Sequence, residues 1–106
     1  EQEVLGVFQP HLYSRTRDFA DAFAQSLSCF DELILLDIYP ARELPIEGVN
    51  SEWLLSKISC KNKQLSSKQN LVKNILKSNA QVVVIIGAGD IGELVENIKN
   101  NLKVEN

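Results

Sequence analysis

The chain has 106 residues, 44% of them hydrophobic and 24% charged, and its formal net charge is −3 at pH 7. This length suits one domain with a single buried core, and the negative charge argues against a nucleic-acid partner, because proteins that bind nucleic acids usually present a basic face. The longest apolar run, Val82 to Ile86, is too short to cross a bilayer, and no basic-then-apolar leader begins the sequence. We therefore expect a cytoplasmic protein without membrane insertion.

Short apolar segments alternate with amphipathic ones along the chain. We predict strands over 4–8, 32–37 and 82–86, and a weaker edge strand over 62–65. The 82–86 segment (VVVII) is apolar throughout rather than alternating. This pattern predicts that both of its faces are covered, as in a parallel sheet.

Each predicted strand is followed by a predicted helix. The first helix has its apolar stripe at Phe19, Ala20, Phe23, Ala24 and Leu27. The residues expected to cap the four helices are, in chain order, Ser14, Asn50 or Ser51, Ser66 or Ser67, and Asp90. A loop over 38–49, punctuated by two prolines and a glycine, precedes the second helix.

This alternation predicts one α/β domain over 1–106, a Rossmann-like three-layer structure with a mainly parallel sheet. The expected strand order is 3-2-1-4, which makes the first and last strands neighbours at a topological switch point. Ligands bind beyond the carboxyl ends of the strands at such a point. We therefore expect a site where the loops over 9–15, 37–43 and 87–90 meet.

The segment after the first strand concentrates polar side chains at the expected start of a helix. Its candidate site residues are His11, Tyr13, Ser14, Arg15 and Arg17. Helix N-terminal N–H groups attract anions, and arginine binds carboxylates or phosphates with two parallel hydrogen bonds. The segment is therefore either a site for an anionic ligand or a capped helix with solvated arginines, and spacing alone does not separate the two.

Two further groups of residues are expected at the same edge. Asp37, Tyr39 and Glu43 could bind a metal or position a substrate, but such residues more often serve loop solvation and helix or loop capping. Gly87, Gly89 and Asp90 form a G-x-G-D turn, a weak dinucleotide signal that a tight turn also explains. With one histidine and two distant cysteines, we predict no metal site.

No phosphate-binding loop, nucleophile elbow or zinc-protease motif occurs in the sequence. We therefore expect this chain to bind no cofactor and to be inactive by itself.

Three segments carry a specific resemblance. They are FQPHLYSRTRDF (8–19), DIYPARE (37–43) followed by PIEGVNSEWL (45–54), and GAGDI (87–91). In order and spacing they resemble the C-terminal domain of the Mur ligase family of peptidoglycan biosynthesis. The FQPH segment with its following YSRTR is most similar to the members that join L-alanine to UDP-N-acetylmuramate.

The resemblance implies a three-domain enzyme in which this chain is only the last domain. The other domains would bind UDP-N-acetylmuramate and ATP with Mg²⁺, and this one would bind L-alanine and close over the ATP domain. It implies that His11 and Arg15 contact the alanine carboxylate, with Tyr13, Ser14 and Arg17 as further candidates. The residues that would line the site or a domain interface are Asp37, Tyr39, Glu43, Gly87, Gly89 and Asp90.

Two features depart from the family pattern. Leu12 stands where many members have an arginine, which removes one candidate carboxylate contact. The D-D-Y-G-H-H-P segment that precedes the first strand in the family is not in this sequence. The alternative that the residues leave open is a free-standing α/β module that binds an anionic ligand at the switch point.

Overall fold

The computed structural model describes residues 3–87 of the chain. Strands and helices alternate along it, as predicted. The strands are β1 (Val4–Gln9), β2 (Glu32–Leu36), β3 (Asn62–Ser66) and β4 (Val82–Gly87). The helices are α1 (Tyr13–Asp18), α2 (Ala20–Leu27), α3 (Ser51–Ser56) and α4 (Leu71–Leu76).

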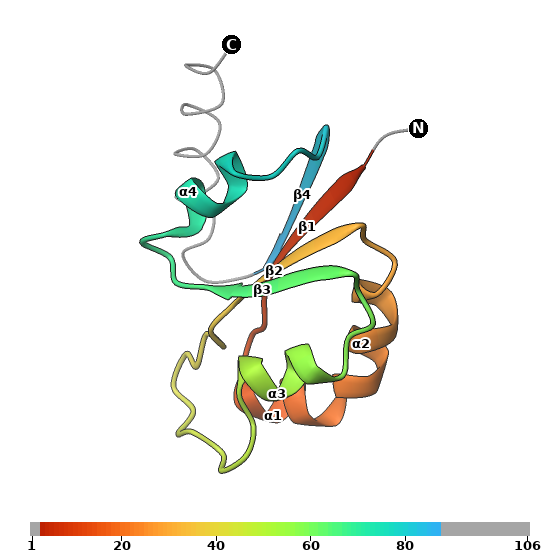
Figure 1. Ribbon diagram of the computed structural model, residues 1–106. Coiled ribbons are helices and arrows are strands. Elements are labelled where there is room, and N and C mark those ends of the chain that lie inside the picture. The colour runs from red at the N-terminus through yellow and green to blue at the C-terminus, as the bar shows by residue number, and fades with distance from the viewer. Residues whose placement is uncertain (1–2, 88–106) are drawn as a thin grey trace.

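The four strands form one parallel sheet in the order β3-β2-β1-β4 (Figure 1). The predicted order is thereby confirmed. β1 pairs with β4 over its whole length, and Gln9 lies opposite Gly87. Because both strands run in the same direction, their carboxyl ends meet at the predicted switch point.

Helices cover both faces of the sheet, which gives the three predicted layers. On one face, Phe8, Leu33 and Leu35 pack in a buried cluster with apolar residues from α2 and from α3 and the segment after it. On the other face, Leu5, Val7, Ile34 and Leu36 pack against Leu71 and Ile75 of α4. Figure 1 shows α4 on the opposite side of the sheet from α1, α2 and α3. Successive residues of β1 and β2 thus serve different cores, as strand geometry requires.

The first predicted helix is divided. α1 ends at Asp18 and α2 begins at Ala20, and Phe19 between them is 55% exposed instead of joining the apolar stripe. The predicted start of the third helix was also wrong. Ser66 ends β3, and the Ser67 hydroxyl accepts the N–H of Asn70 in a turn, so the helix begins only at Leu71.

β4 is less covered than its apolar sequence predicts. Val84 and Ile86 are 37% and 41% exposed, and among the described residues β4 pairs with β1 alone at the edge of the sheet. The helix predicted after Asp90 lies outside the described residues. Within 3–87, no helix is long and apolar enough to cross a membrane.

Candidate functional site

The segments that follow β1 and β2 continue side by side beyond the sheet. The N–H of Tyr39 donates to the Pro10 carbonyl and the N–H of Leu12 donates to the Tyr39 carbonyl, both at 2.8 Å. The His11 ring stacks on the Tyr39 ring, with centroids 5.7 Å apart and an angle of 24° between the planes. These contacts hold the imidazole at the carboxyl edge of the sheet.

A cavity of about 220 Å³, here called the His11 cavity, opens beside this imidazole. It is lined by Phe8, Gln9, His11, Arg15, Phe23, Ile86 and Gly87. Three of the predicted site residues, His11, Arg15 and Gly87, are thus brought together from the segment after β1 and from the end of β4, which are far apart in sequence. The cavity combines one guanidinium and one imidazole with an apolar wall made by Phe8, Phe23 and Ile86.

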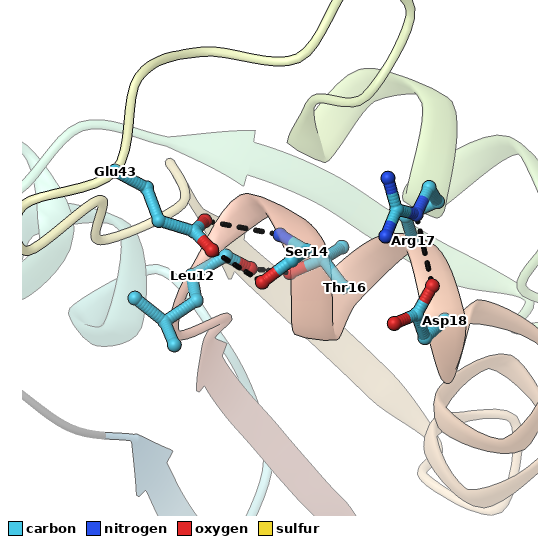
Figure 2. A network of polar contacts seen from close by, with 6 residues as sticks. All are labelled: Leu12, Ser14, Thr16, Arg17, Asp18 and Glu43. Carbon is cyan, nitrogen blue, oxygen red and sulfur yellow. Dashed lines mark hydrogen bonds and ion pairs between the residues drawn. The ribbon is translucent and has the colours of Figure 1, made fainter.

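The start of α1 is occupied by a carboxylate of the chain itself. The N–H of Ser14 donates to Oε1 of Glu43 at 3.0 Å, and the Ser14 hydroxyl donates to Oε2 of the same carboxylate (Figure 2). The Ser14 hydroxyl bond, and then the N–H bond, lower the pKa of the Glu43 carboxyl. The sequence left open whether an external anion binds at this helix start, and in the structure the Glu43 carboxylate occupies the first turn.

The predicted cap of this helix was therefore wrong. Leu12, not Ser14, occupies the N-cap position, and its φ is 73°. Its carbonyl accepts hydrogen bonds from the N–H of Thr16 at 3.1 Å and from the Thr16 hydroxyl at 2.7 Å. Thr16 is fully buried, so these bonds fix the backbone of Leu12 in an orientation that few non-glycine residues adopt.

The remaining candidates of this segment lie elsewhere. Nε of Arg17 is 2.9 Å from Oδ1 of Asp18, at the other end of α1 from Glu43 (Figure 2). This hydrogen bond and charge raise the pKa of the Arg17 guanidinium. Arg17, Ser14 and Tyr13 do not line the His11 cavity. Of the two arginines in the segment, Arg15 alone is placed to meet a ligand there.

A second cavity, here called the Gln9 cavity, has a volume of about 270 Å³. Its lining is Gln9, Asp37, Ile38, Tyr39, Pro40, Ser67, Lys68 and Gln69. It therefore holds Asp37 and Tyr39 of the predicted site, whereas Glu43 is bound to α1. Gly89 and Asp90 lie outside the described residues. Among residues 3–87 no group of three or more His, Cys, Asp or Glu side chains could hold a metal ion.

Sequence reasoning missed Gln9 as a site residue. It was placed in a loop, since a glutamine before proline is typical of a strand end. The structure includes it in β1, leaves it 2% exposed, and places it in the lining of both cavities. No local pattern in the sequence indicates this burial, although a buried amide needs a hydrogen-bond partner.

Comparison with known proteins gives one consistent group of relatives. No family model matches the chain. The UDP-N-acetylmuramate–L-alanine ligases of Flavobacterium psychrophilum and Christiangramia forsetii are 65% and 64% identical to it over 101 residues. The ligase of the same name from Porphyromonas gingivalis is 53% identical over 104 residues. These matches cover 95–96% of this chain but only 22–23% of each relative, so the chain spans less than a quarter of their length.

Proposed function

Because this chain is homologous to a segment of the UDP-N-acetylmuramate–L-alanine ligases, as its motifs predicted, we propose that it is the C-terminal domain that binds the amino acid in such a ligase. In this proposal, UDP-N-acetylmuramate and ATP with Mg²⁺ bind to other domains of a longer protein. The reaction would take place in the cytoplasm and serve peptidoglycan biosynthesis.

The observation that carries the proposal is the composition of the His11 cavity. A guanidinium offers two parallel N–H donors to a carboxylate, and a fixed imidazole adds a third donor beside it. The apolar wall of Phe8, Phe23 and Ile86 suits a short aliphatic side chain. With a volume of about 220 Å³, the cavity fits a small amino acid such as L-alanine.

The carboxylate would be recognised by side chains rather than by the start of α1. Glu43 already accepts from Ser14 there, and a second anion beside it would be repelled. Arg17 is paired with Asp18, and Leu12 offers no charge. Arg15 therefore provides the main attraction, and His11, held by Tyr39, orients the carboxylate.

The proposed role in the reaction is positioning. ATP would convert the lactyl carboxylate of the sugar into an acyl phosphate, and the amine of alanine would then displace phosphate and form the amide. Anchoring the alanine carboxylate at Arg15 leaves the amine free to attack, and fixing one reactant in this way lowers the entropic part of the barrier.

The test uses a full-length ligase that contains this segment. Arg15→Ala should lower kcat/KM for L-alanine about 30- to 150-fold, which corresponds to roughly 2–3 kcal/mol for hydrogen bonds to a charged group. Arg15→Lys should recover only part of this loss, because an ammonium cannot bind in the two-pronged mode. The KM values for ATP and UDP-N-acetylmuramate should stay within a few-fold.

Arg17→Ala is the matched control, since Arg17 lies in the same helix but is bound to Asp18. Its alanine kinetics should equal those of the unsubstituted enzyme. A folded Arg15→Ala enzyme with unchanged alanine kinetics would remove the His11 cavity from the proposal.

A further inference from the structure

Gln9 carries an unsatisfied polar atom at the switch point. Its Oε1 is buried and has no hydrogen-bond partner among the described residues. Its Nε2 donates to the Asp37 carbonyl across 3.5 Å, the outer limit of a hydrogen bond. A buried acceptor without a donor is costly, so native proteins rarely keep one without a use for it.

Gln9 lines both cavities, and strand geometry directs its side chain toward the Gln9 cavity. Neighbouring residues of a strand point to opposite faces. The Phe8 ring lies 5.3 Å from the Phe23 ring, on the face covered by α2. The side chain of Gln9 is therefore directed to the face covered by α4, where Ser67, Lys68 and Gln69 complete the cavity.

The lining of this cavity indicates the chemical class of its ligand. It includes one acidic residue, Asp37, and one basic residue, Lys68, whose Nζ is 5.7 Å from the centroid of the Tyr39 ring. An opposite charge next to each would be attracted, whereas a simple cation or anion would meet one like charge. A volume of about 270 Å³ admits only a small molecule.

We propose that the Gln9 cavity is a second ligand site, separate from the His11 cavity, that binds a small zwitterion whose ammonium group donates to Oε1 of Gln9. The acid group of the ligand lies toward Lys68. Because Nε2 is held by a single long contact, the amide can turn to present Oε1 when the ligand enters. The site does not depend on the function proposed above.

The experiment is an NMR titration of the 106-residue chain with four probes: glycine, trimethylglycine, methylammonium and acetate. Glycine should shift the side-chain amide signals of Gln9 and the backbone signals of residues 67–69, with a dissociation constant in the millimolar range. Trimethylglycine has the same charges but no N–H donor, so it should leave these signals in place. Methylammonium and acetate should bind there at least several-fold more weakly than glycine.

Three variants locate the effect. Gln9→Leu removes the acceptor and should weaken glycine binding at these signals about tenfold or more. Asp37→Asn, at an exposed position, should weaken it several-fold. Arg15→Ala should not change it, so a failure of the proposed ligase site is distinguishable from a failure of this one.

Equal binding of glycine and trimethylglycine would overturn the proposal, as would unchanged affinity in Gln9→Leu. A titration in which no probe shifts these signals, and in which Gln9 contacts only a slowly exchanging water, would also overturn it. That water would then be the partner of Oε1.

Discussion

The helices α1 and α3 begin in opposite ways. At α3, Asn50 has an extended backbone with φ −154°, and its Oδ1 accepts the N–H of Trp53 at 2.7 Å. At α1, the N-cap residue Leu12 has φ 73° and no side-chain acceptor, and the carboxylate that binds the first turn is that of Glu43, 29 residues beyond Ser14. One helix is capped by its own sequence and the other by a distant loop.

This difference separates a helix start that is capped locally from one that is capped by a distant loop. The first turn of α3 is capped by the adjacent Asn50, and the helix buries Leu54 in the core. α1 depends on the 38–49 loop for its first turn and carries Arg15, which lines the His11 cavity. The helix that presents the candidate ligand contact is thus the one whose start can be altered from outside.

The backbone of Leu12 should give the largest effect that distinguishes the two starts. A positive φ costs an L-residue roughly 1–2 kcal/mol, whereas glycine adopts it freely. Leu12→Gly should therefore be more stable than Leu12→Ala by about 1 kcal/mol, although both lose the same half-buried side chain. Urea unfolding of both variants measures the difference. Asn50 has an extended backbone, so Asn50→Gly should be less stable than Asn50→Ser. Equal stability of the two Leu12 variants would show that the positive φ is not retained.

The local cap of α3 should give the next largest effect. Asn50→Ala removes the acceptor for the Trp53 N–H and should reduce the free energy of unfolding by about 1 kcal/mol. Asn50→Asp and Asn50→Ser should keep most of it. Thermal or urea unfolding of the three variants is the measurement, and an Ala variant as stable as the Asp variant would contradict a capping role.

The distant cap should give the smallest effect, visible in its dependence on pH. The pKa of Glu43 is lowered in the folded chain, so its contribution is complete above the unfolded value of about 4.3 and is lost as the pH falls through the folded value. The stability difference between the natural chain and Glu43→Gln should therefore be larger at pH 7 than at pH 3. Glu47→Gln, an exposed position of the same loop, is the matched control. A difference that stays constant between the two pH values would contradict the bond to Ser14.

The sequence predicted the architecture and the α3 start for the same reason: both depend on local patterns. Alternating apolar and amphipathic segments led to the strand order, and Asn50 was one of two predicted caps at α3. Ser51, the other, instead donates its hydroxyl to the Leu36 carbonyl. His11, Arg15 and Gly87 were placed together because parallel strands end at one edge.

What escaped prediction depends on contacts between distant segments. No local pattern predicts that Glu43 binds Ser14 or that Thr16 fixes the Leu12 carbonyl. The break between the two helices at Phe19 was not predicted either. The burial of Gln9 could not be predicted either, since residues 67–69, which line the Gln9 cavity with it, belong to another loop. Periodicity identifies faces of elements, but it does not identify which loop covers the end of a strand.

The paired backbone bonds between Pro10, Leu12 and Tyr39 bear on how this edge opens. Because each segment donates one N–H to the other, neither can leave without breaking both bonds. The two segments therefore form one unit of local unfolding, and the amide hydrogens of Leu12 and Tyr39 should exchange with solvent at closely matched opening free energies. A ligand that secures His11 would then slow exchange at Tyr39, a residue that lines the other cavity.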